Sequence, residues 1–134
     1  MKIKLAILLL LFASVTIAQN NEPLNSAEQM PEFVGGQEKM MQFISNNLKF
    51  PASALKDTTF NACKTLIKFV VEADGKVTNE AIVRECLGCS DCDKEAIRVI
   101  ASMPKWSPGK NAGKPVAVRM ALPIFFQKPL KNAK

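Results

Sequence analysis

The sequence predicts an α+β domain of two layers, a three-stranded antiparallel sheet with two helices packed on one face. Two stretches, residues 37–48 and 93–103, carry apolar side chains at spacings of three and four, which is typical of an amphipathic helix. Three other stretches, residues 65–71, 77–84 and 115–127, alternate with the two-residue period of a strand. The expected order is therefore α-β-β-α-β, and placing both helices on one face of the sheet buries the apolar stripes.

Both predicted helices have start and stop signals. The turn Pro31-Glu-Phe-Val-Gly-Gly36 precedes the first helix, and Pro51 prevents its continuation, although residues 52–56 could form one more helical turn. Acidic residues at the start of the second helix complement its positive N-terminal end, and Pro104 ends it.

The first two strands are joined by Asp74-Gly75, which is among the stronger hairpin signals that a sequence can carry. Two strand registers fit this turn. In the first, a plain two-residue turn sets Cys63 opposite Cys86.

In the second register, a type I turn is followed by Gly75 as a left-handed bulge residue. This register sets Lys68 opposite Glu80 and Val71 opposite Val77. We prefer it, because it pairs charge with opposite charge and apolar with apolar side chains across the strands.

The third strand is expected at an edge of the sheet. Residues 105–114 before it have the Pro and Gly content of a loop. Pro123 has no N–H group to give to a strand ladder, so the strand that contains it should have one unpaired side.

The first eighteen residues have the layout of a secretory signal peptide. A short positive region, Met1–Lys4, precedes an apolar run, and small residues at Thr16 and Ala18 offer a cleavage site. The alternative is an uncleaved anchor, but Leu5–Ala18 is shorter than the roughly 20 residues that a membrane-spanning helix needs. We expect cleavage and a mature form without a membrane span, in the periplasm or secreted.

The mature chain divides into three parts. Residues 19–30 form a polar leader, residues 31–128 form the domain, and residues 129–134 form a loose tail.

The composition excludes several kinds of function. The chain has no His, so it cannot contain a Ser-His-Asp or Cys-His nucleophile or a His metal ligand. Its 18 basic residues are scattered, whereas nucleic-acid binding normally needs a basic stripe. We therefore expect no catalytic residues, no cofactor and no nucleic-acid partner.

The four cysteines are expected to converge at one end of the hairpin. Cys63 opens the first strand, and Cys86, Cys89 and Cys92 follow the second at three-residue steps. Two disulfides, a four-thiolate zinc site, an iron–sulfur cluster or a redox-active C-x-x-C pair are the competing interpretations. Export favours disulfides and no metal, because thiols outside the cytoplasm are normally oxidised.

Two disulfide pairings remain open at this point. We expect Cys63 to be joined to one of the three downstream cysteines. The bulged register favours Cys63 with Cys92, which leaves Cys86 and Cys89 as neighbours. The plain turn favours Cys63 with Cys86. Our preference for the first pairing follows from our preference for the bulged register.

Six motifs occur in order along the chain: Pro31-Glu-Phe-Val-Gly-Gly36, Phe69-Val-Val-Glu-Ala-Asp-Gly75, Glu95-Ala-Ile-Arg-Val99, Met103-Pro-Lys-Trp106 with Pro108-Gly109, Gly113-Lys-Pro-Val116 and Leu122-Pro-Ile124. Together, in this order and spacing, they resemble the C-terminal domain of TonB proteins, in the form common in Bacteroidetes-type bacteria. The resemblance covers nearly all of residues 31–127.

The resemblance implies a periplasmic, non-enzymatic module that binds an extended peptide of an outer-membrane TonB-dependent transporter or a related envelope protein. The peptide would add as a strand beside the last strand. The residues implied as the binding edge are Val116, Ala117, Val118, Arg119, Met120, Ala121 and Leu122. From the residues alone, this strand would be only the edge that every open sheet has. The alternative function is that of an exported cysteine-based redox or metal-binding protein.

The chain departs from the family's full energy transducers, which have an inner-membrane anchor and a long spacer. Residues 19–30 would extend to only about 40 Å at ~3.5 Å per residue. We therefore expect the domain to occur here without the energy-transducing machinery.

Overall fold

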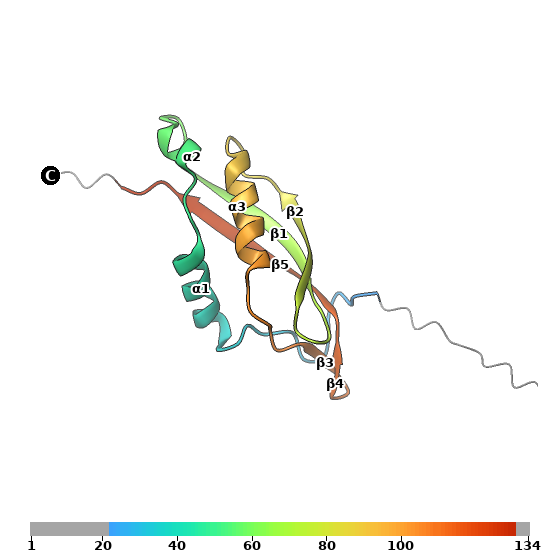
Figure 1. Cartoon of the computed structure of the whole chain (residues 1–134). Coiled ribbons are helices and arrows are strands. Elements are labelled where there is room, and N and C mark those ends of the chain that lie inside the picture. Colours follow the sequence, from blue (N-terminus) through green and yellow to red (C-terminus); the bar gives the residue numbers. More distant parts are fainter. Residues whose placement is uncertain (1–21, 131–134) are drawn as a thin grey trace, which may run out of the picture.

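The computed structural model describes residues 22–130 and confirms the predicted two-layer α+β fold (Figure 1). A three-stranded antiparallel sheet has the order β2-β1-β5, so β1 is central and β5 forms one edge. A separate two-stranded ribbon, β3-β4, precedes β5. The elements are α1 (Gly36–Asn47), α2 (Ala52–Lys56), β1 (Ala62–Val71), β2 (Val77–Arg84), α3 (Ser90–Ala101), β3 (Gly109–Asn111), β4 (Lys114–Val116) and β5 (Val118–Gln127).

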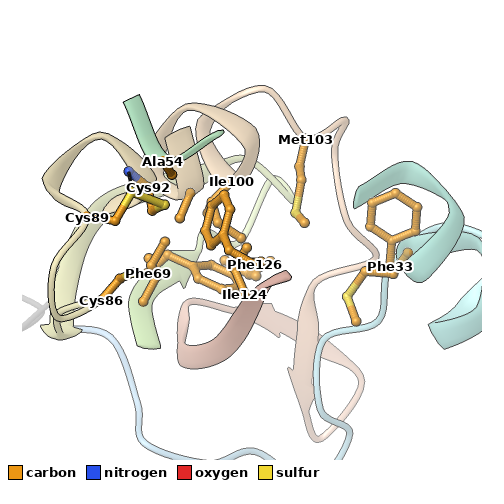
Figure 2. Close-up of a cluster of buried hydrophobic side chains, with 14 of the residues drawn as sticks. Phe33, Ala54, Phe69, Cys86, Cys89, Cys92, Ile100, Met103, Ile124 and Phe126 are labelled. Carbon is orange, nitrogen blue, oxygen red and sulfur yellow. Dashed lines mark hydrogen bonds between the residues drawn. A yellow bond between two sulfur atoms is a disulfide. The ribbon is translucent and has the colours of Figure 1, made fainter. Parts of the chain in front are cut away.

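The helices cover one face of the sheet and enclose the core with it. Figure 2 shows the cysteines of the α3 end at one side of this core and Phe33 at the other. The fully buried core side chains come mainly from the central strand, the edge strand and α3. They include Ile67, Phe69 and Val71 of β1, Ile124 and Phe126 of β5, and Cys92, Ala96 and Ile100 of α3.

None of the helices within residues 22–130 has the length and apolar content to cross a membrane. The predicted signal peptide, residues 1–18, lies outside the described residues, as do the start of the leader and the end of the tail.

The turn between β1 and β2 is the predicted type I turn with a left-handed bulge. The Gly75 N–H donates to the Glu72 carbonyl and the Glu72 N–H donates to the Lys76 carbonyl, both at 2.8 Å. Gly75 has a φ of +88°, which glycine adopts without steric cost. This geometry sets Val71 opposite Val77, as predicted.

Farther along the hairpin, the predicted register is wrong. Lys68 lies opposite Ala81 and not opposite Glu80, because an irregularity separates this pair from the pairs nearer the turn. Asn79 has a φ of +53° at this point, a conformation that asparagine tolerates better than most residues. A second irregularity follows between Ile67 and Leu66, so β2 advances by two positions in all relative to β1.

The expectation of a plain loop before β5 is also wrong. β3 and β4 form a short hairpin in which Asn111 pairs with Lys114. Its two turn residues, Ala112 and Gly113, have φ values of +49° and +75°, as a tight primed turn requires. The strand predicted at residues 115–127 is therefore divided, and the part in the main sheet begins at Val118.

Candidate functional site

β5 pairs with β1 along its whole length on one side only. All ten residues from Val118 to Gln127 face a β1 partner in one continuous antiparallel register. The opposite side of β5 is an edge of the sheet, as the position of Pro123 predicted.

Two main-chain hydrogen bonds show which β5 residues direct their N–H and C=O groups to the open edge of the sheet. The Arg119 N–H donates to the Leu24 carbonyl outside the sheet at 2.7 Å, whereas the Lys128 N–H donates to Asn61, just before β1, at 2.9 Å. Main-chain groups alternate in direction along an antiparallel strand. The odd-numbered residues Ala121, Phe125 and Gln127 therefore present their N–H and C=O groups to the open edge.

The leader already covers the first part of this edge. Leu24 forms a parallel bridge with Val118. Its N–H donates to the Ala117 carbonyl at 2.9 Å, in addition to the bond that it accepts from Arg119. The Arg119 guanidinium also donates to the Pro23 carbonyl and to Asn25 Oδ1. Beyond Asn25 the leader leaves β5, and Gln29 pairs instead with Lys110 of β3.

An apolar hollow of about 320 Å³ lies beside the same strand. Met120 and Leu122 form its wall on β5, and both are half-buried. The opposite wall comes from the turn at residues 31–33 and from the first residues of α1. This helix lies beside β5 in Figure 1. The opposite wall includes Phe33 of the turn and Met40 of α1, and Trp106 also lines the hollow.

The seven residues predicted as a binding edge do not form one uniform strand. Val116 belongs to β4 and pairs with Gly109. Ala117 connects the two strands and is joined to Leu24. Only the five residues from Val118 to Leu122 belong to β5, and the edge continues beyond them to Gln127.

The four cysteines form two disulfides, Cys63–Cys86 and Cys89–Cys92. The expectation that Cys63 is joined to one downstream cysteine agrees with the structure, but the preferred partner, Cys92, is wrong. Two register shifts, one at Asn79 and one between Leu66 and Ile67, move β2 out of the bulged register that favoured the Cys63–Cys92 pairing. The Cys63–Cys86 bond thus joins β1 to the segment after β2.

Asp93, one of the acidic residues at the start of α3, holds neighbouring segments together in addition to complementing the helix N-terminus. Its carboxylate is 7% exposed, and Oδ1 accepts hydrogen bonds at 2.8 Å from the Thr65 hydroxyl and the Cys86 N–H. It therefore joins α3, β1 and the cysteine loop. The sequence does contain one indication that Asp93 is buried: it lies three residues before Ala96, and residues three apart share one face of a helix.

A charged pair joins α3 to the end of α1. Glu95 accepts hydrogen bonds from the Arg98 guanidinium at 2.6 and 2.8 Å and from the Lys49 N–H at 2.7 Å. Arg98 also donates to the Asn47 carbonyl at 2.7 Å. The bond from Arg98 lowers the pKa of Glu95 below its ordinary value, and the same pair raises the pKa of Arg98.

The comparisons with known proteins agree with this geometry. The family model described as Gram-negative bacterial TonB protein C-terminal matches residues 46–127. The solution structure of the Helicobacter pylori TonB C-terminal domain superposes with a TM-score of 0.51 at 22% identity, over 67% of this chain and 90% of that one. No curated protein matches the chain. The family match spans more than half of the sequence, and the chain therefore belongs to the TonB C-terminal family of transport-associated interaction domains.

Proposed function

We propose that this domain binds an extended peptide by strand addition to the outer edge of β5. The observation that carries the proposal is the row of outward-pointing main-chain groups at Ala121, Phe125 and Gln127. Among residues 22–130, these groups have no main-chain partner outside the sheet. An added strand would satisfy them and gain affinity from main-chain hydrogen bonds.

The leader supports this mode of binding, because it shows that the edge accepts an extended segment. Leu24 lies parallel to β5 and exchanges two main-chain hydrogen bonds with it. A peptide that runs in the same direction can pair from Ala121 onward while the leader stays in place. To pair with Arg119 as well, it has to displace Leu24.

The hollow beside β5 supplies a basis for selectivity. Met120 and Leu122 alternate with the outward-pointing residues and face the hollow lined by Phe33, Met40 and Trp106. Alternate side chains of an added strand would enter this apolar space. The favoured peptide therefore carries an apolar side chain at every second position.

We infer that the peptide belongs to an outer-membrane TonB-dependent transporter or a related envelope protein. Membership of the TonB C-terminal family supports this class of partner. The signal-peptide layout of residues 1–18 supports export to the periplasm, where such a segment is accessible.

Capture from a Gram-negative envelope extract tests the proposal with one designed variant. Ala121→Pro removes an outward N–H group and leaves the ladder with β1 intact, as Pro123 already does two residues away. We expect wild-type protein to capture an outer-membrane transporter and Ala121→Pro to lose it.

Ser26→Pro is the matched control, because Ser26 is an exposed residue of the leader beyond its contact with β5. It should capture the same transporter as the wild type. Circular dichroism establishes that both variants are folded. Undiminished capture by folded Ala121→Pro would place the binding surface elsewhere, and failure of the wild type to capture any transporter would reject the proposed partner.

A further inference from the structure

The two disulfides lie in contact with one another. The Sγ atoms of Cys63, Cys86 and Cys92 all lie within 4.8 Å of one another, although Cys92 is bonded to Cys89 and not to either of them. Cys92 is fully buried at the start of α3. One sulfur of the Cys89–Cys92 bond thus lies beside both sulfurs of the Cys63–Cys86 bond.

We propose that the four cysteines form a thiol–disulfide exchange site, in which an incoming thiol enters at Cys89 and Cys92 passes the exchange to the Cys63–Cys86 bond. The proposed peptide binding does not depend on this site, which lies at the other end of the hairpin from the leader contact.

Entry at Cys89 follows from the surface around it. A hollow lined by residues 85–90 and Asp93 reaches both Cys86 and Cys89, which are 2% and 5% exposed, whereas Cys92 is fully buried and does not line it. Leu87, in the middle of this loop, is 86% exposed. Of the two sulfurs in the Cys89–Cys92 bond, Cys89 is therefore the one that a small thiol can meet from this side.

Each exchange step conserves electrons. The incoming thiolate attacks Cys89 Sγ, forms a mixed disulfide with it and releases Cys92 as a thiolate. The Cys92 thiolate attacks Cys63 Sγ, which forms a Cys63–Cys92 bond and releases the Cys86 thiolate. Cys86 then attacks Cys89, closes a Cys86–Cys89 bond and expels the original thiol unchanged.

Local structure favours these steps. Cys89 caps the N-terminus of α3, and its Sγ accepts a hydrogen bond from the Cys92 N–H at 3.1 Å, which holds both sulfurs of this bond at the helix end. The Cys86 N–H is held by Asp93 Oδ1 at 2.8 Å, which keeps Cys86 beside α3 during the exchange. The net result is a second disulfide isomer, which ties β1 to α3 in place of the segment after β2.

Two single variants of the full chain test the coupling through Cys92. In Cys89→Ser, Cys92 is a free thiol beside the Cys63–Cys86 bond. After incubation in a glutathione redox buffer, non-reducing peptide mapping should find Cys92 linked to Cys63 or Cys86 in part of the population. In Cys92→Ser, the sulfur that joins the two bonds is absent, and Cys63–Cys86 should be the only internal linkage.

The wild type provides a test that needs no substitution. Reduced glutathione in catalytic amount should produce the Cys63–Cys92 and Cys86–Cys89 linkages, and alkylation during the reaction should trap the glutathione adduct on Cys89. The proposal would be overturned if Cys89→Ser kept only its Cys63–Cys86 bond and the treated wild type kept only its two original disulfides. A glutathione adduct found only on Cys63 would overturn entry at Cys89.

Discussion

The main-chain N–H of Trp106 donates a 2.8 Å hydrogen bond to the carbonyl of Gly75, which ties the β1–β2 turn to the segment after α3. The approach is so close that a Cβ atom on Gly75 would overlap the Trp106 carbonyl oxygen. Glycine is therefore required at this turn for two reasons, its φ of +88° and the nearby main chain.

Gly75→Ala should lower the free energy of unfolding by about 2–4 kcal/mol, because the left-handed conformation and the overlap both destabilise it. Gly113→Ala is the matched control, since Gly113 has a φ of +75° but open space at its Cβ position. Gly113→Ala should lower the free energy of unfolding by only about 1 kcal/mol. Chemical denaturation measures both values, and equal losses would show that the contact with Trp106 contributes nothing.

Asp93→Ala should destabilise the domain by about 2–4 kcal/mol, because it leaves the buried Thr65 hydroxyl and Cys86 N–H without their acceptor. Asp93→Asn keeps one acceptor oxygen and should cost less. Asp91→Ala removes an exposed hydrogen bond from Ser53 and should stay within about 1 kcal/mol of the wild type. Similar losses for the Asp91 and Asp93 alanine variants would contradict the assigned role of Asp93.

Leu24→Pro should free the start of the β5 edge, because it removes the N–H that bonds to the Ala117 carbonyl. Hydrogen exchange of the Arg119 amide, measured by NMR, should become roughly fivefold faster, as expected from the loss of about 1 kcal/mol of hydrogen bonding. The Met120 amide, which points toward β1, should keep its protection, and Ser26→Pro should change neither. An unchanged Arg119 rate would mean that the leader does not protect this edge.

Acid should weaken the link between α1 and α3. The hydrogen bond from Arg98 lowers the pKa of Glu95 below 4.5, so ionised Glu95 stabilises the fold above that pH, and this contribution is lost as the pH falls through the lowered value. Glu95→Gln should therefore be less stable than the wild type at neutral pH, with a difference that shrinks as the pH falls through the lowered pKa of Glu95. Denaturation at several pH values measures it, and a difference independent of pH would contradict the linkage.

Sequence periodicity was sufficient to predict the main elements and the hairpin turn. The apolar spacing located α1 and α3 to within three residues at each end, and Asp74-Gly75 indicated the bulged turn. Pro123 indicated the edge strand, because its missing N–H can point only to an unpaired side.

Local irregularities could not be predicted in the same way. Two irregularities, one of them at Asn79 with its positive φ, move the register of β2 before Cys63 is reached, but nothing in the alternation pattern marks them. The strands of the β3–β4 hairpin have three residues each, too short to show a period. The contact of Leu24 with β5 is an isolated bridge between residues far apart in sequence, so no periodic pattern could predict it.

The position of β5 as the last strand of the chain has a consequence for folding. Both disulfides and the β1–β2 hairpin are complete in sequence before Val118, so an emerging chain can form them without its final strand. Until β5 arrives, β1 is itself an edge strand, and its buried Ile67, Phe69 and Val71 side chains lack their β5 neighbours, Leu122, Met120 and Val118. A chain shortened before β5 therefore exposes a long apolar strand, which is a typical starting point for aggregation.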